Sequence, residues 1–198
     1  MITGKPALLI NEMQTFVVDP EHSGFPAMAK QAQERGITAK IIALADAFRN
    51  AGAPVFHAPV HGRPDRADVK ANSLIAAMSL KGKPLPPGDP RGNYVPGLEA
   101  QEGDFEIDRT SGMIAMCGTQ LDTLMRRIGI ETVVVAGVST NLGVAGNVIV
   151  AEEMGYHVVV PEDCIAGSDP DTHRAIVENQ LRMVARIVQS EDIIAALA

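Results

Sequence analysis

One carboxylate stands at the end of the first apolar run of the chain. Residues 7–10 have the composition of a buried strand, and Glu12 follows them by two positions. Burial at the end of a strand removes water from a carboxylate, raises its pKa and suits it to general acid or base catalysis. A helix-capping or ion-paired carboxylate is the alternative. The adjacent Met13–Gln14 pair and the turn described next favour the catalytic interpretation, and they make Gln14 a candidate substrate contact.

The second candidate site is the segment 137–144, GVSTNLGV, which follows the apolar run 132–136. It opens an amphipathic stretch that ends near Met154, as expected for a strand, a tight turn and a helix start. Amides at a helix start point outward unpaired, and with the helix dipole they can hold an anion or a developing oxyanion. Gly143 lets a substrate approach the backbone closely; its alternative role is to ease packing of the helix on the sheet. The candidate substrate contacts of the turn are Ser139, Thr140, Asn141 and Leu142, although Asn141 is equally expected as an ordinary N-cap.

No obvious nucleophile accompanies these residues. The hydroxyls of Ser139 and Thr140 lie on the turn, but the sequence offers no evident histidine as their base. Cys117 lies away from the turn, and Cys164 is expected to be a buried packing thiol. With no sign of a disulfide framework, we expect both thiols to be free.

The elements that position these residues alternate along the chain. Short β-rich apolar runs followed by helical patterns predict a parallel sheet covered on both faces. Ligands of such sheets bind beyond the carboxyl ends of the strands, where Glu12 and the turn both fall. The expected strands are residues 8–10, 54–58, 132–136, 157–160 and 186–188, and the expected helices are 37–48, 73–79, 119–128, 142–154, 172–183 and one that starts at 190.

The stretch 60–103 carries most of the prolines, so we expect sparse regular structure there. We interpret it as a surface excursion over the active-site end and not as a linker. Residues 1–198 are therefore expected to form a single domain.

The charge and the apolar runs of the chain argue against two classes of partner, nucleic acids and membranes. The net charge of −7 and the absence of a basic stripe argue against nucleic acid as a partner. No apolar run is long enough to span a bilayer and no signal segment is evident, so we expect a cytoplasmic protein without membrane contact. The partner that we expect is a small-molecule substrate or ligand.

Three segments together resemble the isochorismatase-like, or cysteine hydrolase, superfamily. The turn is similar to its Gly-Val-x-Thr-Asn-x-Cys-Val pattern, residues 8–14 (LLINEMQ) to Leu-Leu-x-x-Asp-Met-Gln, and residues 107–122 to Lys-x-x-x-Ser-Ala-Phe-x-Gly-Thr-x-Leu. The family's catalytic Asp, Lys and Cys correspond to Glu12, Arg109 and Gly143, with a one-residue offset at Arg109.

The resemblance covers residues 7–185, and it carries expectations for the fold and the assembly. It implies a three-layer α/β/α fold whose mostly parallel sheet has about six strands. It also implies a cis Val138–Ser139 bond and a homo-oligomer, a dimer or tetramer, with partner residues near the site.

Some amidases of this superfamily bind a metal through an Asp-x-His-His cluster. His57 and His61 would lie on one face of a strand, but the rest of that cluster is absent. We therefore expect no metal and no other cofactor.

Three functions are consistent with these features. The first is a hydrolase that works without covalent catalysis, which is what the resemblance to true isochorismatases implies. In this reaction Glu12 protonates a vinyl ether, and Arg109 neutralises a substrate carboxylate or the developing charge. For Arg109 the alternative is a surface ion pair with Asp108 or Glu106. The second is an inactive family member that binds a small molecule or a protein, and the third, less favoured, is a cysteine-type amidase that uses Cys117.

Overall fold

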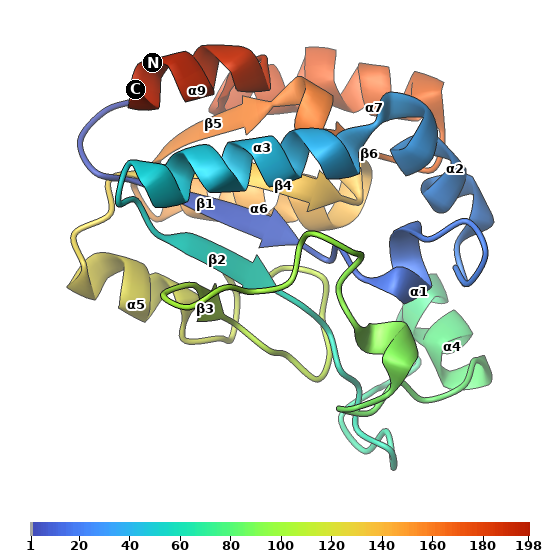
Figure 1. The fold of residues 1–198 in the computed structure, drawn as a ribbon. Helices are drawn as coiled ribbons and strands as arrows, with labels where there is room; N and C mark the ends of the chain where they lie inside the picture. The colour runs from blue at the N-terminus through green and yellow to red at the C-terminus, as the bar shows by residue number, and fades with distance from the viewer. Residues whose placement is uncertain (1) are drawn as a thin grey trace.

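A parallel sheet runs through the middle of the molecule, with helices on both of its faces (Figure 1). The computed structural model describes residues 2–198. The strand order is β3-β2-β1-β4-β5-β7, β6 pairs with the end of β4, and every pairing is parallel. The strands are β1 (Pro6–Asn11), β2 (Val55–Ala58), β3 (Phe105–Glu106), β4 (Thr132–Val138), β5 (His157–Pro161), β6 (Ile165–Ala166) and β7 (Arg186–Val188).

This architecture confirms the predicted three-layer α/β/α fold and mostly parallel sheet. The sheet has seven strands, whereas about six were expected. Two of the seven, β3 and β6, are only two residues long. Such short strands carry no alternation that a sequence could reveal.

The central strands are buried on both faces, and successive side chains enter opposite cores. In β1, Ala7 and Leu9 pack into one core, whereas Leu8 and Ile10 pack into the other. The continuous apolar runs of the sequence follow from this double burial.

The helices form the outer layers. Side chains of α1 (Thr15–Val18), α2 (Pro26–Arg35), α3 (Ile37–Asn50) and α9 (Ser190–Leu197) enter one core. Those of α5 (Leu121–Arg127), α6 (Ala145–Glu153) and the continuous stretch α7 (Pro170–Ile176), η4 (Val177–Leu181) and α8 (Arg182–Val184) pack on the other. None of the helices within residues 2–198 combines the length and the apolarity that crossing a bilayer would require.

Residues 60–103 form the expected excursion, which lies toward the end of the sheet to which β1 and β2 point (Figure 1). Its regular elements are α4 (Leu74–Lys81) and the single turn η1 (Pro90–Gly92). The predicted helix is confirmed as α4, where the Ser73 hydroxyl accepts a hydrogen bond from the Ala76 N–H at 3.2 Å.

The helix expected over residues 119–128 is present as α5, which begins two residues later, at Leu121. Gln120, not Thr119, is the N-cap of α5, and the Thr119 hydroxyl donates to the Ala115 carbonyl at 2.6 Å. The same hydroxyl accepts from the Leu121 N–H at 3.1 Å. Thr119 therefore satisfies the N–H of Leu121, the first residue of α5, from the position before the N-cap.

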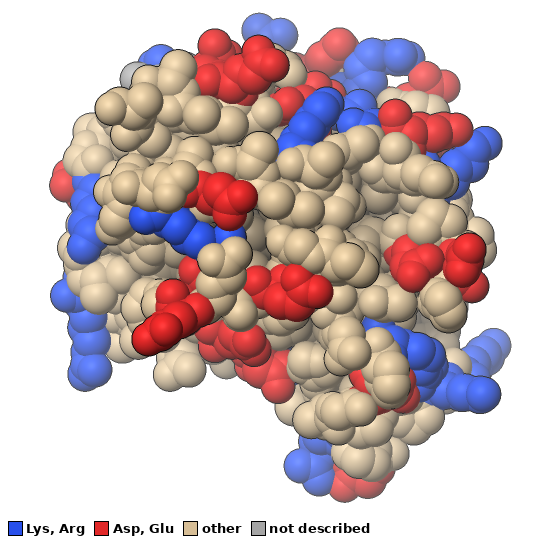
Figure 2. Space-filling view, in the orientation of Figure 1, with Lys and Arg blue, Asp and Glu red and all other residues tan. Residues whose placement is uncertain are grey.

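Charge is dispersed over the visible surface. On the face drawn in Figure 2, lysine and arginine side chains are interspersed with acidic ones and do not gather into a stripe.

Candidate functional site

The carboxyl ends of β1 and β4 meet in the middle of the sheet, where Asn11 pairs with Gly137. From this point the strand order runs outward in two directions, through β2 and β3 on one side and β5 and β7 on the other. Open α/β sheets bind ligands at such a switch point. Glu12 and the turn after β4 both lie there, as the sequence predicted.

Glu12 leaves β1 in an unusual backbone conformation. Its φ of 54° lies in the left-handed region, which is uncommon for a residue with a β-carbon. Its N–H donates to the Ala58 carbonyl at 3.4 Å, and about one fifth (19%) of its side chain is exposed. The Glu12 side chain is thus held at the strand end and is largely buried.

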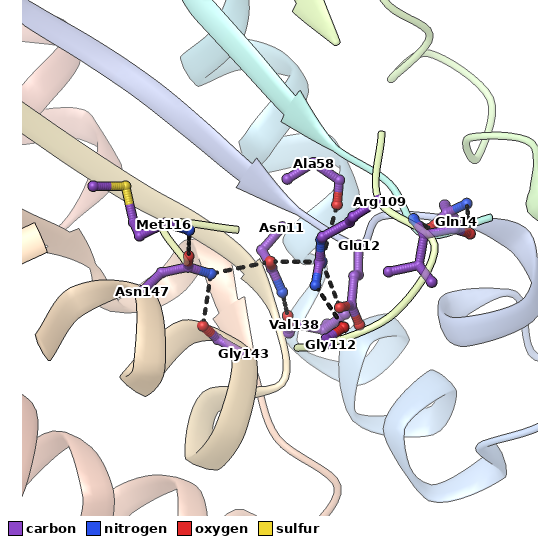
Figure 3. Close-up of polar contacts among 11 residues, drawn as sticks. Asn11, Glu12, Gln14, Ala58, Arg109, Gly112, Met116, Val138, Gly143 and Asn147 are labelled. Carbon is purple, nitrogen blue, oxygen red and sulfur yellow. Dashed lines mark hydrogen bonds and ion pairs between the residues drawn. The ribbon is translucent and has the colours of Figure 1, made fainter. Parts of the chain in front are cut away.

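Arg109 lies directly against this carboxylate, with Nη2 donating to Glu12 Oε1 at 2.6 Å (Figure 3). Nη2 also donates to Asn11 Oδ1 and to the Ala58 carbonyl, both at 3.2 Å, and Nη1 donates to the Gly112 carbonyl at 2.8 Å. Its side chain is only 4% exposed. The alternative of a surface pair between Arg109 and a neighbouring acid is therefore wrong.

The protonation state of Glu12 reflects two opposing effects. Burial raises the pKa of the Glu12 carboxyl above its ordinary value, and the charge and hydrogen bond of Arg109 oppose that rise only in part. Glu12 therefore keeps a proton to higher pH than an exposed glutamate does.

Gly143 has no room for a side chain. A β-carbon at this position would lie 2.5 Å from Asn11 Nδ2, 3.2 Å from the Val138 carbonyl oxygen and 3.3 Å from that of Met113. The Asn11 amide group donates to the Val138 carbonyl, which fixes it against the turn (Figure 3). The space that a nucleophile side chain would need is thus occupied by Asn11.

Asn147, the third residue of α6, completes this polar cluster. Its Nδ2 donates to Asn11 Oδ1 at 3.1 Å and to the Gly143 carbonyl at 2.8 Å, and its Oδ1 accepts from the Met116 N–H at 3.0 Å. Sequence reasoning missed both Asn11 and Asn147. Their signal was a polar residue in an otherwise apolar strand and another on the inner face of a helix.

The turn itself is η2 (Thr140–Val144), and the predicted cis bond between Val138 and Ser139 is present. The N–H groups of Leu142 and Val144 both donate to the Ser139 carbonyl, at 3.1 and 3.0 Å. These two amides are therefore not the unpaired donors that the sequence predicted. The N-cap interpretation of Asn141 is also wrong, because Asn141 lies inside η2 and its Oδ1 accepts from the Ser139 hydroxyl at 3.0 Å.

A histidine that the sequence did not reveal lies behind the turn. Thr140 Oγ1 and His173 Nδ1 are 2.8 Å apart, and His173 Nε2 lies 3.0 Å from Glu162 Oε1. Thr140 and His173 also line a small pocket of about 90 Å³ between η2 and the start of α7. In the sequence, nothing marked His173 as a neighbour of Thr140.

Gln14 has a different environment from the other predicted contacts. It is fully buried, its Nε2 donates to the Gly92 carbonyl at 2.7 Å, and its Oε1 accepts from the Val60 N–H at 2.8 Å. Its amide thus holds two segments of the excursion against the connection between β1 and α1, and we assign it no substrate contact.

The thiols are both free, with Cys117 exposed and the predicted burial of Cys164 confirmed. His57 contacts Asp104 and His61 contacts Asp108. Within residues 2–198, no group of three or more His, Cys, Asp or Glu side chains is placed to hold a metal ion.

Comparison with known proteins identifies the family. The isochorismatase domain family matches residues 6–192, nearly the whole chain. The chain belongs to the isochorismatase family. It is 31% identical over 154 residues to the uncharacterized isochorismatase family protein YecD of Escherichia coli O157:H7, a match that covers 78% of this chain and 79% of the relative.

Two further relatives extend the comparison. The maleamate amidohydrolase of Pseudomonas putida is 25% identical over 173 residues, which span 86% of this chain and 76% of that enzyme. A crystal structure of an isochorismatase family protein from Desulfovibrio vulgaris superimposes with a TM-score of 0.84 at 25% identity and covers 98% of both chains. At family level, the chain is an isochorismatase-family hydrolase.

Proposed function

We propose that this protein hydrolyses a small metabolite without a covalent nucleophile, with Glu12 as the general acid or base. The observation that carries the proposal is the packing around Gly143. Asn11 fills the space of a nucleophile side chain there, while a carboxyl with a raised pKa lies beside Arg109 at the same strand ends. A site of this kind retains proton transfer and charge stabilisation.

The reaction that best fits a raised carboxyl pKa is vinyl ether hydrolysis. Glu12 donates its proton to the vinyl carbon and leaves an oxocarbenium ion, to which water adds while returning a proton to Glu12. The resulting hemiketal then breaks its C–O bond to give a ketone and an alcohol. Arg109, 2.6 Å away, stabilises the Glu12 carboxylate that proton donation leaves.

Amide hydrolysis is the second reaction of the same site, and the similarity to a maleamate amidohydrolase supports including it. Here Glu12 is the base that takes a proton from water as the water attacks the carbonyl. Glu12 then returns that proton to the amide nitrogen as the C–N bond breaks, which gives a carboxylic acid and an amine. N–H groups of the turn other than those of Leu142 and Val144 would receive the oxyanion.

The deciding experiment is hydrolysis of a panel of vinyl ethers, small amides and small esters by the wild type and by Glu12→Gln. Loss of general acid or base catalysis predicts a rate lower by about 100-fold or more for Glu12→Gln. Glu153→Gln, an exposed change at the end of α6, is the matched control and keeps the wild-type rate. An unchanged rate in Glu12→Gln would rule out its catalytic role.

The pH profile separates the two reactions. If Glu12 is the acid, it works while protonated, so the rate is constant at low pH and falls as pH rises through the raised pKa. If it is the base, the rate rises through the same pKa. A vinyl ether substrate with a rising limb would contradict the acid role.

Two alternatives have their own outcomes. A binding protein without activity would turn over no substrate in the panel, while its ligand would raise the melting temperature. An amidase that uses Cys117 would lose activity in Cys117→Ala and form a thiol adduct there; unchanged activity in that variant excludes it.

A further inference from the structure

Four side chains from four elements form one hydrogen-bonded chain behind the turn. Thr140 in η2 contacts His173 in α7, and His173 contacts Glu162 in η3 (Glu162–Cys164). Arg35 at the end of α2 donates from Nη2 to Glu162 Oε1 at 2.6 Å and to the Glu162 carbonyl at 2.8 Å. The reaction proposed for Glu12 does not use these four hydrogen-bonded side chains.

The direction of each hydrogen bond follows from the charge of Glu162. The hydrogen bond with His173 lowers the pKa of Glu162 to about 2, against the effect of part burial and with help from Arg35. An ionised carboxylate only accepts, so His173 Nε2–H donates to it. In the neutral ring Nδ1 is then the acceptor, and the Thr140 hydroxyl donates to Nδ1.

Thr140 depends on this single side-chain partner. Thr140 is fully buried and His173 is 5% exposed, so loss of this bond leaves the Thr140 hydroxyl without a side-chain partner. Full burial also keeps a substrate carbonyl from reaching Oγ1. The geometry of a hydroxyl, a histidine and a carboxylate therefore serves here to hold the hydroxyl in place and not to present it as a nucleophile.

We infer that His173 and Glu162 are positioning residues, which fix the turn that carries Gly143 by holding Thr140 from behind. The inference rests on the proposed function only where it concerns the rate of hydrolysis. A turn that moves changes the placement of its amides relative to Glu12, and misplacement of about 1 Å can lower a rate by about 100-fold.

The test compares Thr140→Val with Thr140→Ser in the full chain. Valine keeps the shape and removes the hydroxyl, whereas serine keeps the hydroxyl and restores the bond to His173. Amide hydrogen exchange of the segment 139–144 is expected to be about 10-fold faster in Thr140→Val than in the wild type, and close to wild type in Thr140→Ser. Thr123→Val, an exposed change on α5, is the matched control with no effect.

Activity gives the second measurement. On any substrate of the panel, Thr140→Val is expected to lower kcat by about 100-fold with KM nearly unchanged, and Thr140→Ser to recover most of the rate. If the wild type turns over no substrate, the proposed function fails, but hydrogen exchange still decides the inference. Equal exchange rates in the valine and serine variants would overturn it.

The role of His173 is tested by a double-mutant cycle. His173→Leu removes both of its hydrogen bonds, so its effect on exchange should overlap with that of Thr140→Val instead of adding to it. Additive effects would show that the two residues act separately. Stoichiometric labelling of Thr140 by a serine-directed fluorophosphonate would also overturn the inference, because it would make Thr140 a nucleophile.

Discussion

At Gly143, the packing of neighbouring atoms determines whether the turn can carry a nucleophile side chain. Adding a single methyl group there forces a contact with the Asn11 amide, which is itself bonded to the Val138 carbonyl. Asn11 Nδ2 is held in place by that bond, and the other two atoms near the methyl group are backbone oxygens, of Val138 and Met113. A cysteine at this position therefore cannot simply be restored to give a thiol nucleophile.

Gly143→Ala is expected to lower the free energy of unfolding by about 1–3 kcal/mol, because overpacking shifts Asn11 and the turn. Urea denaturation measures the change. The matched control is Gly24→Ala, where a β-carbon would meet only the Phe16 carbonyl oxygen, at 3.9 Å. A Gly143→Ala protein as stable as the control would show that Asn11 yields easily.

Helix α6 is hydrogen-bonded to three other segments of the site. Through the side chain of Asn147 it contacts the end of β1, the turn before it and the segment of Met116. Buried polar groups that bridge three segments fix one arrangement of those segments, since every bond must be made at once. The position of α6 therefore sets the spacing between Asn11 and Gly143.

Asn147→Leu keeps a side chain of similar size and leaves the Met116 N–H and the Gly143 carbonyl without their partner. Unsatisfied buried groups cost about 1–3 kcal/mol each, so we expect a loss of at least about 1 kcal/mol in the free energy of unfolding. Urea denaturation against Asn179→Leu, an exposed asparagine of η4, checks this. Equal stability of the two variants would contradict the bridging role.

At the scale of the whole molecule, a buried histidine links the sheet to its outer layer. His57 on β2 is fully buried, and its Nε2 lies 3.1 Å from Asp104 Oδ2, which also accepts from Arg49 of α3 at 2.7 Å. Burial lowers the pKa of His57 below its usual value, and Asp104 opposes this only in part. His57 is therefore neutral in the folded protein at pH 7.

This pKa shift has a defined sign for stability. Unfolded His57 binds a proton below about pH 6.5, whereas folded His57 does so only at lower pH, so acidification favours unfolding. The stability that neutral, buried His57 contributes to the folded state is fully present above about pH 6.5, and it is lost as the pH falls through the pKa of folded His57. His57→Gln should reduce the fall in the free energy of unfolding between pH 7.5 and pH 5.5, whereas the exposed His157→Gln should not. Parallel curves for His57→Gln and the wild type would contradict it.

Association of copies also belongs to this scale. The expected dimer or tetramer stays a prediction, which light scattering of the purified chain measures directly.

The sequence alone determined the central strands and most of the helices. Their apolar runs and helical spacings are local signals, imposed by burial on both faces of the sheet. It did not reveal α2, whose buried side chains Met28, Ala29 and Ala32 form only a weak apolar stripe, although Pro26 is an ordinary helix start. It also placed Glu12 and the turn at strand ends, where parallel strands bring their carboxyl ends to one edge.

Only the tertiary structure decided which residues complete the site. Counting along the motif left Arg109 one residue out of register, and its correspondence to the family lysine stays a prediction. The structure adds the contact of Arg109 with Glu12, 97 positions away in the chain. His173 lies 33 positions from Thr140, and Asn147 lies 136 from Asn11. Contacts between residues so far apart leave no periodic pattern in either segment, because they depend on how the strands are ordered and how the helices pack between them.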